Sequence, residues 1–231
     1  MARRTIRVSL ALAVIDALTG KPVLRGAKVC LESGLPAIRK SDGYWVFVDL
    51  PPDFYTVIVE APFYQKRKLQ IQVGDGFSLI QVAMLPGKNF PFSQPVKWLE
   101  GEFSIEQPVW AALEEDPPRF RMIESFAKGA QDISLYFTGT AFSIQRIWIK
   151  MKGKKGKLFW LSPQPNRQGE YHIDSPLPWE IDHTAKVLPV VEVERDAAGH
   201  YEFPLLPMCK SICFVKQDGT LLTPKRRTGD E

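Results

Sequence analysis

The chain has 231 residues, enough for one large or two small domains, and 45% hydrophobic with 24% charged residues is the balance of a folded globular protein. Its net charge of +4 is too small to indicate a nucleic-acid-binding protein, and three cysteines exclude a disulfide framework. With 19 prolines, 16 glycines and few helical repeats, the composition predicts a mostly β fold of short strands and turns.

The first twenty residues superficially resemble a secretion signal, with arginines followed by an apolar run. Arg7 and Ser9 interrupt that run, and Asp16 stands where a signal peptide has small residues before its cleavage site. We therefore interpret residues 5–14 as the first strand. No apolar run approaches the roughly 18 residues that a membrane span needs, so the sequence predicts a cytoplasmic protein without a membrane span.

About seven short strands follow one another in the first 85 residues, separated by turn signals. Gly20 and Pro22 mark the first turn, and the pair Asp42-Gly43 indicates a hairpin. The clearest stretch is SDGYWVFVDLPPDFYTVIVEAPFY (residues 41–64), which predicts two strands joined by a Pro-Pro turn. Strands at this spacing are typical of a β-sandwich.

An ordered set of residues runs through the same region. It consists of Asp16, Thr19, Gly20, Pro22, Gly26, Asp42, Gly43, Trp45, Phe47, Leu50, Pro51, Tyr55, Val57, Val59, Phe63 and Tyr64. The set resembles carboxypeptidase regulatory-like domains, and this resemblance implies a transthyretin-like, immunoglobulin-like sandwich over roughly residues 5–86. The chain departs from the family at Phe63, where a glycine is common, and in a longer loop at residues 23–26. Such modules have no catalytic residues, so the resemblance implies a binding, spacing or anchoring role.

The alternation of side chains along a strand makes a further prediction for residues 44–48. If Trp45 and Phe47 point into the sandwich, the outward residues are Tyr44, Val46 and Val48, although a free-standing sandwich normally has polar residues there. Either a loop or the second domain covers this face, or the face docks a partner. Its three residues are therefore candidate partner-binding residues.

Composition also predicts the domain boundaries. They are a sandwich at 1–86, a Pro-rich linker at 87–95, a second β-rich, sandwich-like domain at 96–223 and a disordered tail at 224–231. In the linker, Phe90 and Phe92 either fix the two domains together or dock into a groove of a partner. In the second domain we expect a short helix from Pro108 and a turn of helix around residues 179–184.

A basic hairpin is predicted for IWIKMKGKKGKLFWL, residues 147–161. Residues 146–157 hold six basic residues and no acidic one. The lysines of the tip are Lys152, Lys154, Lys155 and Lys157. They are either a solvated tip that discourages edge pairing or a finger that contacts an acidic partner, nucleic acid or a membrane surface. Nucleic acid is not the expected partner, because Trp148 and Trp160 follow the strand pattern of core residues.

No recognised catalytic motif occurs: the chain has no nucleophile elbow, phosphate-binding loop, dinucleotide fingerprint or zinc-protease motif. The residues with most metal-ligand character are His172, Asp174, Asp182 and His183, and their spacing matches no zinc motif. We predict a protein that is not an enzyme and that has neither a cofactor nor a metal.

Three functions fit these features. The first is a non-catalytic structural or adapter protein that contacts other subunits of a larger assembly, or copies of itself. The N-terminal pattern, followed by Leu85-Pro86 and the Phe-Pro-Phe segment, also resembles small accessory proteins of phage-tail-like contractile injection systems, which implies incorporation in a released particle. The second is a carbohydrate-binding accessory module that uses some of the six tryptophans for stacking. The third is a metal-dependent hydrolase that uses the histidines and aspartates above.

Overall fold

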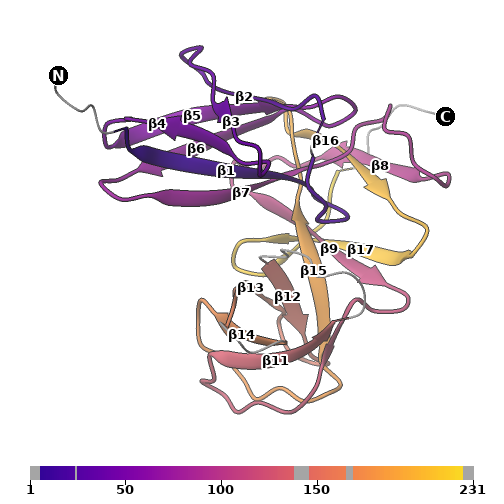
Figure 1. Cartoon of the computed structure of the whole chain (residues 1–231). Coiled ribbons are helices and arrows are strands. Elements are labelled where there is room, and N and C mark those ends of the chain that lie inside the picture. Colours follow the sequence, from indigo (N-terminus) through magenta and orange to yellow (C-terminus); the bar gives the residue numbers. More distant parts are fainter. Residues whose placement is uncertain (1–5, 24, 138–145, 165–168, 226–231) are drawn as a thin grey trace, which may run out of the picture. The chain divides into compact units, whose positions relative to one another are not determined.

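The computed structural model describes residues 6–23, 25–137, 146–164 and 169–225 (Figure 1). This part of the chain contains strands and turns and no helix, which confirms the mostly β prediction. No helix long and apolar enough to cross a membrane is therefore found in it. The chain divides into two compact units, Met1–Pro91 and Phe92–Glu231, with the division inside the predicted linker.

The described part of the first unit has seven strands in two sheets. They are β1 (Val8–Asp16), β2 (Lys28–Leu31), β3 (Ile38–Arg39), β4 (Trp45–Val48), β5 (Asp53–Glu60), β6 (Arg67–Val73) and β7 (Ser78–Met84). One sheet has the order β3-β4-β1-β7 and the other has the order β2-β5-β6. Neighbouring strands are antiparallel, except that β1 and β7 run parallel.

An apolar core lies between the two sheets of the first unit. It takes Leu10, Phe47 and Met84 from one sheet and Val57 and Ile71 from the other. Alternate residues of each strand enter this core because side chains of a strand alternate between its faces. The first unit is therefore a two-layer sandwich, in agreement with the sequence pattern, and its relation to a particular family stays a prediction.

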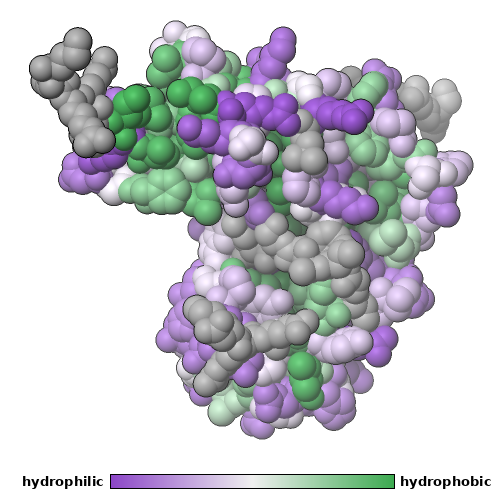
Figure 2. Space-filling view, in the orientation of Figure 1, coloured by the Kyte–Doolittle hydropathy of each residue, from purple (hydrophilic) through white to green (hydrophobic). Residues whose placement is uncertain are grey.

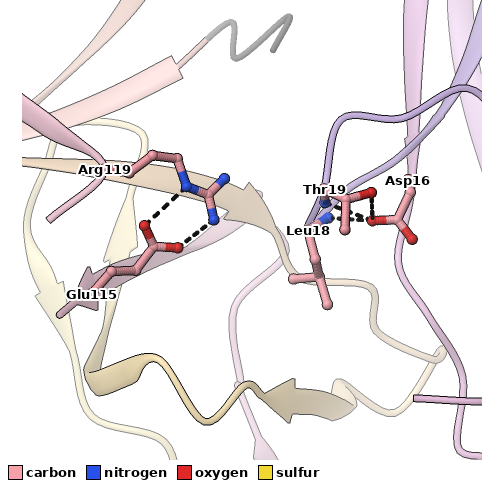
Figure 3. A network of polar contacts seen from close by, with 5 residues as sticks. All are labelled: Asp16, Leu18, Thr19, Glu115 and Arg119. Carbon is pink, nitrogen blue, oxygen red and sulfur yellow. Dashed lines mark hydrogen bonds and ion pairs between the residues drawn. The ribbon is translucent and has the colours of Figure 1, made fainter. Parts of the chain in front are cut away.

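The two ends of the quoted sequence pattern meet in this unit. Asp16 is buried, and its Oδ1 accepts hydrogen bonds from the backbone N–H groups of Leu18 and Thr19, at 2.9 and 2.7 Å, and from the Thr19 hydroxyl at 2.9 Å (Figure 3). Its Oδ2 accepts a hydrogen bond from the Tyr64 hydroxyl at 2.9 Å. Burial and the negative charge of Asp16 raise the pKa of Tyr64 above its ordinary value. Asp16 thus ties the first turn to the segment after β5.

Phe63 has a φ of +70°, in the left-handed region that favours glycine. This is the position at which the sequence departs from the regulatory-like pattern, where glycine is common. The backbone here therefore follows the geometry that the pattern implies, with a bulky residue in a conformation that costs it free energy.

The described strands of the second unit are more numerous. They are β8 (Lys97–Glu102), β9 (Val109–Glu115), β10 (Phe120–Met122), β11 (Asp132–Phe137), β12 (Arg146–Lys150), β13 (Lys157–Pro163), β14 (Glu170–Ile173), β15 (Lys186–Glu192), β16 (His200–Leu205), β17 (Cys209–Lys216) and β18 (Leu221–Leu222). A nine-stranded sheet has the order β10-β11-β14-β13-β12-β15-β9-β17-β18, and β8 pairs with β16 in a separate ladder. Lys225, which the sequence placed in a disordered tail, exchanges backbone hydrogen bonds with Glu102; residues 226–231 lie outside the described part.

Part of the large sheet curls around its own core. Ile147, Ile149 and Phe159 belong to a core to which β10, β11, β12, β13, β14 and β15 contribute, and β10 also lies beside β15. The second domain is β-rich, as expected, and this part of it is a half-barrel in which the sheet encloses its core by bending. Elsewhere in this unit, Phe103 stacks on Tyr201 with ring centroids 4.8 Å apart.

The helix predicted from Pro108 is wrong: this segment is strand β9. β9 lies between β15 and β17, and the residues from Val109 to Leu113 are all buried. A strand that is covered on both faces reads as a continuous apolar run, which periodicity cannot distinguish from a buried helix. The helical turn expected around residues 179–184 is also wrong, since Ile181 instead exchanges backbone hydrogen bonds with Phe126.

Candidate functional site

The outer face of the β3-β4-β1-β7 sheet carries an apolar row that crosses all four strands. Ile38 pairs with Val46, and Val46 pairs with Ala11. Ala11 in turn pairs with Leu79 in the parallel ladder. Directly paired residues of neighbouring strands point to the same face of a sheet. The two ends of this row, Ile38 and Leu79, are 49% and 57% exposed, whereas its middle is buried.

The predicted outward residues of β4 lie at this face as expected from alternation, since Phe47 is in the core. Tyr44, just before β4, is 37% exposed, Val48 is half-buried and Val46 is buried. The sequence missed Ile38 and Leu79, because nothing local says which strands become neighbours of β4 and β1. Figure 2 shows hydrophobic side chains gathered on the surface over this part of the first unit.

Strand β7 closes one side of the same sheet and, among the described residues, pairs with β1 alone. Its sequence SLIQVAM contains neither a charged residue nor a proline. Exposed edge strands are a hazard for proteins, because their unpaired backbone groups attract other strands, and charges or prolines usually protect them. β7 is thus an unprotected edge next to an apolar face.

The two linker phenylalanines each contact an aromatic ring of their own unit. Phe90 meets Tyr64 edge to face, with ring centroids 5.2 Å apart, and Phe92 meets Trp98 in the same way at 6.3 Å. Both phenylalanines are half-buried. Each phenylalanine therefore packs on its own unit, and neither contact needs an external groove; whether the linker fixes the two units together stays a prediction.

The basic hairpin forms as the sequence predicts, with Ile149 of β12 opposite Lys157 of β13. Its tip is held by the turn between β17 and β18. Lys155 Nζ lies 3.3 Å from Asp218 Oδ2, and buried Gly156 contacts the Trp148 indole so closely that a Cβ would clash. The tip is therefore supported by its own unit and is not an isolated finger.

Two of the four tip lysines, Lys155 and Lys157, have a partner within their own unit. Lys157 donates a hydrogen bond to the Pro176 carbonyl at 3.4 Å and lies over the ring of Phe159. Lys152 and Lys154 are exposed at the turn, with no ion pair to another described residue. Two point charges on a turn are a small target, so this tip is a weaker candidate interface than the apolar row.

A cleft of about 260 Å³ opens beside β12 and β13. It is lined by Arg146, Lys157, Leu158, Phe159, Trp160, Asp174, Ser175 and Gln217. The Arg146 guanidinium stacks between two indoles, with its Cζ 3.3 Å from the Trp160 ring centroid and 3.8 Å from that of Trp110. Burial lowers the pKa of Arg146 to about 10. Its Nε is buried without a hydrogen-bond partner in the described structure.

The tryptophans differ in exposure in a way that the sequence did not predict. Trp110 and Trp148 are buried, but Trp160, expected in the core, is 39% exposed at this cleft. The expectation for Trp160 was wrong because β13 presents it on the outer face of the half-barrel, opposite Arg146 in the ladder. The stack was missed because β9, which supplies Trp110, is distant in sequence from the β12–β13 hairpin, which supplies Arg146 and Trp160.

The residues with metal-ligand character do not converge. His172 Nδ1 lies 2.9 Å from Asp132 Oδ1, and Asp174 accepts a hydrogen bond from the Trp160 backbone N–H at 2.9 Å. Asp182 instead accepts hydrogen bonds from the N–H and hydroxyl of Thr184. Among the described residues, no three His, Cys, Asp or Glu side chains are grouped to hold a metal ion. The structure therefore offers no support for the metal-dependent hydrolase.

Comparison of the chain with protein-family models and with curated proteins gives no match. Function must therefore be inferred from the surfaces themselves: an apolar sheet face with an unprotected edge in the first unit, and an aromatic cleft in the second.

Proposed function

We propose that this chain is a non-catalytic structural or adapter protein that acts through contacts with other protein subunits. The apolar row on the outer face of the first sheet carries the proposal. Solvent-facing positions of a sandwich are normally polar, and large apolar side chains exposed there indicate a protein contact. The row spans the sheet from Ile38 to Leu79, but its middle is already buried within the chain, so its exposed ends, Ile38 and Leu79, are what a partner can contact.

A neighbouring residue supports a protein as the partner. Tyr44, at the rim, combines an aromatic ring with a hydroxyl, a type enriched at protein interfaces. The more specific form of the proposal places the chain in a phage-tail-like contractile assembly, made in the cytoplasm and carried in a released particle, and it rests on the resemblance in the sequence.

The test compares tagged chains in extracts of the source cells by sedimentation. We expect the wild-type chain to sediment with a complex larger than itself, and Ile38→Lys to move most of it to the position of the free chain. Ile123→Lys is the matched control, because Ile123 is 56% exposed and lies in the second unit. A wild-type chain that sediments alone, or equal behaviour of the two variants, would reject the proposal.

The aromatic cleft favours one alternative, a carbohydrate-binding accessory module. An exposed Trp160 ring beside Arg146, Asp174 and Gln217 combines an apolar platform with a few polar groups, the usual make-up of a small-molecule site. A glycan array probed with the wild-type chain, Trp160→Ala and Tyr136→Ala tests it, since Tyr136 is an exposed aromatic residue outside the cleft. Binding that only Trp160→Ala removes would establish the alternative, and an array without hits would end it.

A further inference from the structure

Among the strands that the structure describes, every sheet edge but one is short or carries a charged side chain. In the described structure the strands at sheet edges are β2, β3, β6, β7, β10 and β18, together with both strands of the β8–β16 ladder. β18 has two residues, and the remaining edges other than β7 carry at least one charged side chain. β7 has seven residues and no charge. Such an edge is the place where a sheet accepts another strand.

The side chains of β7 alternate between the two faces of its sheet. Leu79 pairs with Ala11 on the outer face, which also places Gln81 and Ala83 there. Val82 lies in the core and Ile80 packs against that core. The strand that pairs with β7 must therefore be apolar towards the core and uncharged on the outer face.

We propose that this strand is β7 of a second copy of the chain, in an antiparallel ladder centred on Gln81. That register sets Leu79 opposite Ala83 of the second copy, and Ile80 opposite Val82 of the second copy. Outer residues then meet outer residues, core residues meet core residues, and no charges of like sign are opposed. The two four-stranded sheets become one sheet of eight strands.

Self-pairing also explains why the edge and the apolar row occur together. In the proposed dimer the two exposed Leu79 side chains lie on the same face, near the junction of the two sheets, so the ends of the two apolar rows adjoin. The inference deepens the proposed function, on which it rests, by naming one partner and by doubling the area offered to another subunit. The surface area that a seven-residue ladder buries is small compared with the total of about 1,200 Å² that stable complexes bury. The dimer should therefore dissociate on dilution.

Analytical ultracentrifugation of the purified full chain over a range of concentrations tests the inference. We expect the wild-type mass to double with rising concentration, and Gln81→Lys to weaken dimerisation at least tenfold, because it opposes two lysines at the two-fold position. Gln72→Lys is the matched control: it makes the same change on β6, which is also a seven-residue edge strand, and should leave dimerisation unchanged. Circular dichroism confirms that each variant is folded.

A charge-swap mixture makes the test specific to the register. Gln81→Glu should be monomeric by itself, like Gln81→Lys, and an equimolar mixture of the two should dimerise again. Recovery on mixing cannot come from misfolded protein, so a failure to recover would overturn the register. A wild-type chain that is monomeric at every concentration would overturn self-pairing.

The outcomes separate this inference from the function on which it rests. If the wild-type chain stays monomeric when pure but Ile38→Lys still releases it from a complex in extracts, self-pairing is wrong and the adapter function stands. If the pure chain dimerises but sediments as a bare dimer in extracts, the adapter function is wrong and self-pairing stands.

Discussion

The two units end their sheets in different ways. The first unit is an open sandwich, and one of its edges, β7, is long and uncharged. In the second unit the large sheet bends until β10 lies beside β15, and its described end strands, β10 and β18, have three and two residues. A sheet that bends on itself exposes fewer unpaired backbone groups at its edges. An open sandwich leaves an edge strand with which another chain can pair.

The units also bury their carboxylates differently. In the first unit, Asp16 accepts hydrogen bonds from uncharged donors of its own turn and from Tyr64. In the second unit, buried Glu115 is held by the Arg119 guanidinium, which donates to both carboxylate oxygens (Figure 3). Desolvation raises the pKa of Glu115, although the charge of Arg119 acts in the opposite direction. The first unit thus relies on neutral hydrogen bonds and the second on an ion pair.

The largest expected effect tests the ion pair. Arg119→Ala should lower the free energy of unfolding of the second unit by roughly 3–5 kcal/mol, because it leaves a buried carboxylate without its counter-charge. Hydrogen exchange read separately on peptides of each unit measures the loss. Lys210→Ala is the control, since it removes an exposed pair with Asp116 and should cost little. Equal losses in the two variants would contradict the contrast between the units.

The pH dependence of that variant sharpens the prediction. A carboxyl whose pKa is higher in the folded state binds its proton more readily there, so stability falls as the pH rises from the ordinary value of 4.5 through the raised pKa of Glu115. Without Arg119 the pKa rises further and the fall is larger. The destabilisation by Arg119→Ala should therefore be greatest at neutral pH and shrink on acidification, and an equal loss at pH values of about 5 and 7 would refute this cause.

A smaller effect is expected from the neutral network. Asp16→Ala should destabilise the first unit by about 2–3 kcal/mol, because it removes the acceptor of the Thr19 N–H and of the Tyr64 hydroxyl. Hydrogen exchange should show the loss in the first unit alone. Asp42→Ala is the matched control, as Asp42 is exposed and accepts one backbone hydrogen bond from Tyr44. Protection that stays unchanged in Asp16→Ala would show that the turn does not depend on its carboxylate.

The smallest effect concerns the positive φ of Phe63. Phe63→Gly should stabilise the first unit by about 0.5 kcal/mol, since relief of a left-handed cost of about 1 kcal/mol is partly offset by the greater freedom of glycine in the unfolded chain. Thermal unfolding checks the sign. Phe77→Gly replaces a similarly exposed phenylalanine without a positive φ and should destabilise slightly. Destabilisation by both would mean that the Phe63 ring contributes more than its backbone costs.

The sequence by itself determined features whose causes are local. Alternating side chains at residues 45–48 predict which of them enter the core, and the glycine-lysine turn predicts the hairpin of β12 and β13, because strand pleating and turn chemistry act over a few neighbouring residues. The density of turn signals likewise predicts a chain that is mostly β.

Tertiary structure decided everything that depends on which strands become neighbours. β9 is a strand because β15 and β17 pair with it on either side, although its apolar run is equally compatible with a helix. Trp160 is exposed because the half-barrel turns it outward, and β7 is an edge because no second strand of its own chain reaches it in the described structure. Strand pairing joins residues far apart in the sequence, so local propensity leaves it undetermined and the packing of the whole core selects it.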